Sequence, residues 1–182
     1  MSTHAIAIRT MVLLKNLFAN LTGNPQIKQL PIDIIFRDEE TASASQDQGR
    51  VTITLPNEFQ QHNVCTDRSL VYGLGTHEFS HVPDITVILQ LLKDAQKVHA
   101  ALPAILNIVE DVRIETHTGE ADDMFDKWLT YVRGLCRQDK PEPKDIWDVL
   151  FTLRFGSPDQ PMSSAIPESW EDDYRTFGAL TI

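Results

Sequence analysis

Residues 66–83 read TDRSLVYGLGTHEFSHVP and contain the pattern that decides the fold, His-Glu-x-x-His at residues 77–81. Thr66 is a typical N-cap and Pro83 ends a helix, so the stretch predicts one helix over about residues 67–82. Residues four apart lie on one face of a helix, so His77 and His81 can reach a single ion. Neutral imidazole is a preferred ligand of zinc, and we therefore expect Zn²⁺ at this helix.

Two further features of this helix bear on chemistry. Glu78 is rotated by about 100° from His77 around the helix axis, which places its carboxylate beside the ion. From there it can take a proton from a water as a general base. Gly73 and Gly75 precede the motif and each costs a helix about 1 kcal/mol. Their presence indicates that a neighbouring element packs closely against the metal-binding helix.

A catalytic zinc ion usually has a third protein ligand. Residues 107–115 read NIVEDVRIE and lie in a second predicted helix, at about 102–117. Asn107, Asp111 and Glu115 recur there at four-residue spacing, and Glu110 adjoins Asp111. One of these carboxylates is the natural third ligand. Without the histidine pair, the same acidic cluster would indicate only a solvated helix face.

The two segments, 77–81 and 107–115, together resemble the metallopeptidase domain of von Willebrand-A-linked proteins. These proteins are related to the T subunit of aerobic cobaltochelatase and occur in phages and bacteria. The resemblance covers about residues 66–117 and implies a zincin-like fold with peptidase activity. A related group of peptidases has an aspartate at the position of Asp111 and no acidic residue at that of Glu110. The resemblance therefore favours Asp111 as the third ligand.

The sequence departs from that family in one respect. Family members usually continue into a von Willebrand A domain, whose metal site begins Asp-x-Ser-x-Ser, and this motif does not occur here. A chelatase-like or adhesive role therefore loses its main support.

The rest of the chain predicts an α+β fold, a minimal zincin-like domain that is mostly helical with a small β-sheet. An amphipathic helix at 4–21 has Thr3 as its expected cap. Strands are expected at 31–37 and 50–55, as a hairpin or as neighbours, because both are rich in β-branched residues. The polar segment between them is expected to be a turn. Further helices are expected at 85–98 and 121–137.

The segment DKPEPKD at 139–145 has two prolines among charged residues, which is typical of a stiff, solvated connector. We therefore expect a zincin-like metallopeptidase domain at 1–138. Residues 139–182 are expected to form a helical or irregular C-terminal extension, with a short helix at 146–155.

Composition narrows the functional classes. The net charge of −10 is poorly suited to binding nucleic acid or an anionic membrane. Cys65 and Cys136 are the only cysteines, so a disulfide framework and a thiolate zinc site both lack support. No run of 18 apolar residues suggests a membrane span. A cytoplasmic setting is the simplest expectation.

The predicted function is zinc-dependent hydrolysis of a peptide bond in a peptide or protein substrate, with Glu78 as general base. Arg113 and Tyr131 are candidate donors to the oxyanion, and His99 and His117 are alternative third ligands. In His-Glu-x-x-His peptidases generally, an edge strand holds the substrate, and the resemblance implies this role for the strand at 51–55. Two alternatives remain: a zinc-binding, non-proteolytic regulatory or assembly module, and a metal-free interaction domain.

Overall fold

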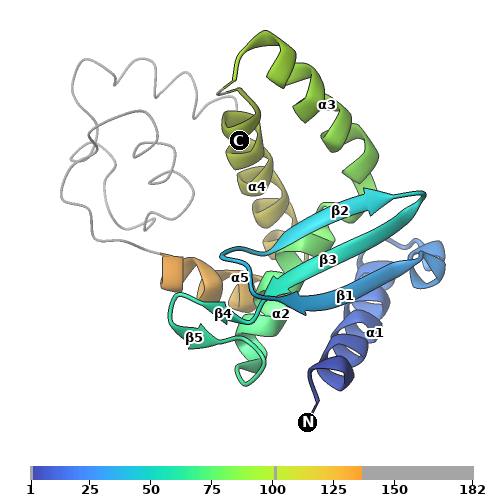
Figure 1. The fold of residues 1–182 in the computed structure, drawn as a ribbon. Helices are drawn as coiled ribbons and strands as arrows, with labels where there is room; N and C mark the ends of the chain where they lie inside the picture. The colour runs from blue at the N-terminus through green and yellow to red at the C-terminus, as the bar shows by residue number, and fades with distance from the viewer. Residues whose placement is uncertain (1, 101, 137–182) are drawn as a thin grey trace.

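The computed structural model describes residues 2–100 and 102–136, and these form an α+β fold, mostly helical with a small sheet, as predicted (Figure 1). The α-helices are α1 (Thr3–Leu21), α2 (Arg68–Ser80), α3 (Ile85–Val98), α4 (Leu102–Ala121) and α5 (Asp123–Cys136). The 3-10 helices are η1 (Pro25–Gln29) and η2 (Val82–Asp84). The strands are β1 (Ile32–Arg37), β2 (Ser43–Asp47), β3 (Arg50–Pro56), β4 (Glu58–Phe59) and β5 (His62–Asn63). The predicted connector at 139–145 and helix at 146–155 lie outside the described residues.

The larger sheet has the strand order β1-β3-β2. Strands β1 and β3 run parallel, with Ile32 opposite Val51, whereas β2 runs antiparallel to β3. A two-residue turn of Gln48 and Gly49, with φ of 47° and 79°, joins β2 to β3. Positive φ at both residues matches the right-handed twist of a hairpin. The result is a sheet with β3 in the centre and β2 at an edge.

Strand β2 lies in the segment that the sequence predicts as a turn, so that prediction is wrong there. Its sequence, SASQD, has no β-branched or aromatic residue, and its side chains alternate between exposed and half-buried. Pairing with β3 therefore holds this segment extended, and local propensity does not. The two predicted strands correspond to β1 and β3. Of the two arrangements expected for them, a hairpin or neighbouring strands, the second is correct, because they are adjacent and parallel.

The helices agree with the prediction apart from their ends. Ser2 caps α1 in place of Thr3, since its hydroxyl accepts a hydrogen bond from the amide of Ala5. Asp67 caps α2 in place of Thr66, and its carboxylate accepts from the amide of Leu70 at 3.1 Å. Helix α4 continues to Ala121, beyond the predicted end at 117. None of the helices in the described part of the chain combines the length and hydrophobicity that a bilayer crossing requires.

Helix α2 is buried between α1 and α5. Phe18 of α1 lies between Phe79 of α2 and Phe125 of α5, with ring centroids 4.8 and 5.0 Å away. A Cβ at Gly73 would lie 2.6 Å from the carbonyl oxygen of Trp128 in α5, and one at Gly75 would lie 3.0 Å from a methyl group in α1. The predicted close approach is therefore confirmed on both sides, and it fixes the helix that carries the two histidines.

Candidate metal centre

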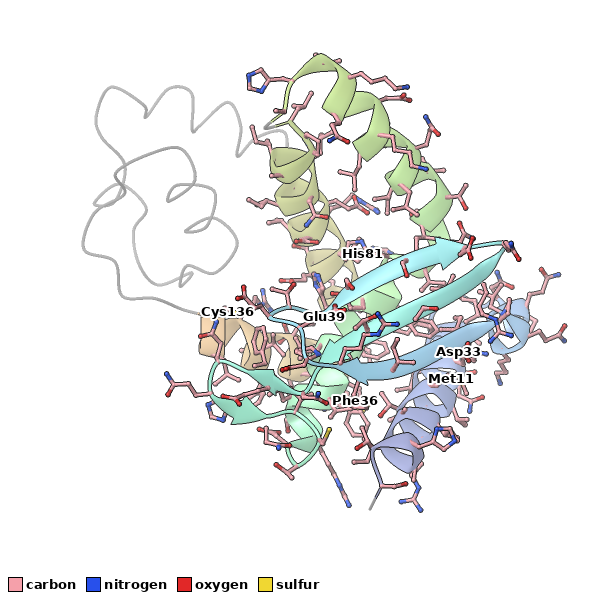
Figure 2. The ribbon with its side chains drawn as sticks, in the orientation of Figure 1. Met11, Asp33, Phe36, Glu39, His81 and Cys136 are labelled. Carbon is pink, nitrogen blue, oxygen red and sulfur yellow. The ribbon has the colours of Figure 1, made fainter. Side chains whose placement is uncertain are left out.

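The structure brings together two histidines at the end of one helix and an aspartate from a second helix. His77 lies in the last turn of α2, His81 is its C-cap, and Asp111 lies in the middle of α4. One ligand atom from each lies within 4.8 Å of the others. Asp111 Oδ1 is 3.4 Å from His77 Nε2 and 3.2 Å from His81 Nε2. His81 follows the end of α2, in the segment that leads through η2 to α3 (Figure 2).

The two distances from Asp111 to the histidines fit a zinc ion. Zinc bonds of about 2.0–2.1 Å in a tetrahedral arrangement separate neighbouring ligand atoms by about 3.3 Å. The two nitrogen–oxygen distances of 3.4 and 3.2 Å agree with that separation. The side chains of His77 and His81 are 11% exposed and that of Asp111 is 2% exposed. Two imidazoles and one carboxylate, shielded in this way, form a donor set that zinc takes.

Glu78 lies beside Nε2 of His77, the ring nitrogen that would bind the ion. Its Oε1 is 4.0 Å from His77 Nε2, and its side chain is 8% exposed. This position agrees with the expectation from helical rotation. The carboxylate therefore lies next to the three candidate ligands and is largely buried.

Glu110 and Asp111 are neighbours on α4 with different partners. Glu110 accepts two hydrogen bonds from the guanidinium of Arg113, at 2.7 and 2.6 Å. Asp111 accepts a hydrogen bond from the Asn107 amide on its Oδ2, at 3.2 Å, while its Oδ1 faces the histidines. The geometry therefore places Asp111 with the histidines, whereas Glu110 pairs with Arg113.

Glu115, one of the carboxylates that the sequence offers as a third ligand, lies instead against the other ring nitrogen of His77. Its Oε1 is 2.8 Å from His77 Nδ1, and its Oε2 is 3.9 Å from Nε of Arg133 in α5. A carboxylate on one ring nitrogen holds the proton there and leaves the other nitrogen for a metal. The four-residue spacing from Asp111 contained the signal for this role, because it places Glu115 on the same face of α4 one turn later.

The charge around His77 is strongly negative. Burial disfavours protonation of His77, but Asp111 and Glu115 more than offset it and raise the pKa of His77 to about 10. A proton and a divalent ion are competing ways to neutralise these carboxylates. The site is therefore suited to a cation.

The two predicted oxyanion donors contact other groups. Arg113 pairs with Glu110 and lies 3.5 Å from Asp84. The hydroxyl of Tyr131 donates to Asp67, the cap of α2, at 2.6 Å. Neither residue lines the cavity at the candidate centre.

The two histidines that the sequence offers as alternative third ligands lie away from the group. His99 and His117 are exposed and do not belong to it. Tyr72 packs its ring on Trp128, with centroids 4.9 Å apart. These positions show that neither histidine joins His77 and His81, and that Tyr72 has a packing role.

A cavity of about 490 Å³ opens beside His77, His81 and Asp111, which we call the metal group. Its walls come from residues 40–44, which include the start of β2, from the inner side of α3, and from α4 and α5. Arg133 supplies a guanidinium to the wall, and Glu78 also lines the space. This volume is in the range that holds small ligands or a short stretch of peptide.

Comparison of the chain with protein-family models, with curated proteins and with solved structures finds no match.

Proposed function

We propose that this chain is a zinc-dependent peptidase in which His77, His81 and Asp111 hold the ion and Glu78 is the general base. One observation carries the proposal: both histidine Nε2 atoms lie within 3.4 Å of one oxygen of Asp111, at the wall of an open cavity that Glu78 also lines. A purely structural zinc site is closed and has no use for a base. The resemblance to the von Willebrand-A-linked metallopeptidase domains points to the same chemistry.

When bound, zinc would polarise the scissile carbonyl and lower the pKa of a water to about 7. The other steps belong to the protein's own side chains. Glu78 accepts the proton of the attacking water and passes it to the leaving amine. The side chain of Glu78 is only 8% exposed. Arg133 lines the cavity and replaces Arg113 and Tyr131 as the candidate donor to the developing oxyanion.

The substrate-holding strand is a correction to the sequence-based expectation. Strand β3, which contains residues 51–55, pairs on both sides, with β1 and with β2. Its backbone therefore has no open edge for a peptide. Strands β1 and β2 are both edge strands, and of the two only β2 lines the cavity, through Ser43 and Ala44. We infer that an extended peptide or protein segment adds to β2 by backbone pairing.

Metal content is the first test. The purified protein is expected to hold about one zinc per chain by elemental analysis, and His81→Ala and Asp111→Ala are expected to lose it. Glu110→Gln is the matched control, because Glu110 adjoins Asp111 but pairs with Arg113. Loss of zinc from the Glu110 variant with retention in the Asp111 variant would overturn the assignment of the third ligand.

Activity is the second test. A fluorogenic peptide library is incubated with the zinc-loaded wild type and with Glu78→Gln, which keeps the shape of the side chain. We expect the variant to retain zinc and to lose activity by about 10²–10⁴-fold. Equal cleavage by both proteins would disprove the peptidase mechanism. Zinc binding without cleavage in the wild type would favour the regulatory or assembly module.

A further inference from the structure

Helix α3 has apolar residues on two different sides. Ile88 and Leu92, one turn apart, are half-buried and line the cavity beside the metal group. Val87 and Leu91 lie on another side and are 61% and 56% exposed. The first pair therefore faces the cavity, whereas the second pair faces solvent.

The inner side of α3 and the edge strand flank the same space. Residues 43 and 44 of β2 line it together with Ile88 and Leu92. A hydrogen bond of 2.8 Å between Thr86 Oγ1 and Gln46 Oε1 ties the start of α3 to β2. A peptide paired with β2 would direct alternate side chains to one face, since successive side chains of a strand point in opposite directions.

We propose that Ile88 and Leu92 form an apolar subsite that takes a bulky aliphatic or aromatic side chain of the substrate next to the bond that is cleaved. This inference rests on the proposed peptidase function and specifies its substrates as peptides with a bulky apolar side chain next to the cleaved bond. The cavity of about 490 Å³ is far larger than an ion and a water require. Half-buried leucine and isoleucine side chains beside that space gain from contact with another apolar group.

The charges around the cavity disfavour an acidic side chain in this subsite. Glu40 lines the wall near β2, and Glu78, Asp111 and Glu115 line the metal side. Arg133, which also lines it, lies within 3.3 Å of Asp126 and 3.9 Å of Glu115. We therefore expect apolar side chains to be preferred over acidic ones of similar size.

Hydroxamates test the subsite without requiring turnover, because this group chelates zinc directly. Two probes are used with the zinc-loaded protein in titration calorimetry: acetohydroxamate, and a hydroxamate of the same kind that carries an isobutyl side chain. The isobutyl probe is expected to bind the wild type at least 10-fold more tightly, as apolar pockets discriminate about 10–200-fold per small apolar group. Leu92→Ala is expected to remove most of this preference and to leave acetohydroxamate affinity unchanged.

Leu91→Ala is the matched control, since it makes the same change on the exposed side of the same helix. It is expected to keep the preference. Ile88→Ala provides a second variant if Leu92→Ala does not fold. Equal affinity of the wild type for both probes, or the same loss in the Leu91 and Leu92 variants, would overturn the apolar subsite and leave the zinc site standing. Failure of acetohydroxamate itself to bind would overturn the metal centre on which both proposals depend.

Discussion

At the residue scale, Glu115 is the neighbour of the candidate ligands on which the proposed zinc affinity is expected to depend most. Its carboxylate lies 2.8 Å from His77 Nδ1 and is 7% exposed. We expect Glu115→Ala to weaken zinc binding by about 10–100-fold, because His77 would lose the group that fixes its tautomer and ring orientation. Competition with a chelating indicator dye measures this affinity.

Two further variants separate orientation from general damage to α4. Glu115→Gln keeps a hydrogen-bond acceptor and is expected to recover part of the affinity. Glu120→Ala removes an exposed carboxylate from the same helix and should bind zinc as the wild type does. An affinity for Glu115→Ala equal to that of the wild type would show that His77 needs no such partner.

The sequence predicted which side chains would lie close together at the candidate site better than it predicted what surrounds them. His77, Glu78 and His81 follow from helical spacing alone, because one rigid turn fixes where the side chains point. Asp111 needed the family resemblance, because spacing within α4 leaves several carboxylates equivalent. Arg133 had no signal, since its place at the cavity depends on how α5 packs against α2.

At the scale of elements, the contact between α2 and α5 depends on Gly73. A Cβ at this position would lie 2.6 Å from the Trp128 carbonyl oxygen, which is backbone and cannot rotate away. We expect Gly73→Ala to lower the free energy of unfolding by about 1–3 kcal/mol through overpacking. Urea denaturation followed by circular dichroism measures the change.

Gly134 in α5 is the matched control for that substitution. A Cβ there meets nothing within 4 Å. Alanine has the higher helix propensity, so Gly134→Ala is expected to stabilise the protein by about 0.5–1 kcal/mol. If both variants changed stability in the same direction, close packing at Gly73 would not be the cause.

The start of α2 gives a pH-dependent prediction. Burial tends to raise the pKa of Asp67, but hydrogen bonds from Tyr131 and from the Leu70 amide lower it below its usual 3.8. A lowered carboxyl pKa contributes stability that is present above pH 3.8 and is lost as the pH falls further. Asp67→Ala is expected to cost about 1 kcal/mol at pH 7, through loss of the cap.

Asp67→Asn distinguishes the charge from the cap, because asparagine also caps helices well. Denaturation at pH 7 and again below pH 4 is expected to show its stability converging with that of the wild type as Asp67 becomes protonated. A difference between these two proteins that stays constant over this range would contradict the role of the charge.

The helices and strands show which secondary structure a local sequence pattern is sufficient to predict. Helices α1, α3 and α5 were predicted from apolar periodicity, which is local information. Strand β2 was missed because its extended form comes from pairing with β3, a contact that no pattern within SASQD reveals. The missed strand also affects the expected substrate-holding strand, since β3 is central and the edge that lines the cavity belongs to β2.

At the scale of the whole molecule, the candidate site lies between two groups of helices that differ in their packing: α1, α2 and α5 form one group, and α3 and α4 form the other. Helices α1, α2 and α5 share an apolar core around Phe18, Phe79 and Phe125. Helices α3 and α4 form a hairpin that extends away from the sheet on its β2 side (Figure 1). The residues that α4 buries are mostly polar: Asp111, Ile114, Glu115 and Thr118.

Polar contacts therefore account for much of the attachment of α4 to α2. Ser80 and Thr118 are hydrogen-bonded at 3.0 Å, and Asp111 and Glu115 face His77. An ion shared between His77, His81 and Asp111 would neutralise buried carboxylates and join the two helices directly. Zinc is thus expected to stabilise this contact more than the apolar core.

We expect zinc at 100 times its dissociation constant to raise the free energy of unfolding by about 2.7 kcal/mol. Hydrogen exchange measured by mass spectrometry should slow most in α4, where buried apolar groups are few, and least in α1. His81→Ala should show neither effect, whereas magnesium, which prefers oxygen ligands, should not replace zinc in the wild type. Equal protection of α1 and α4 would mean that the ion stabilises the fold as a whole, and protection of the His81 variant would mean that it binds elsewhere.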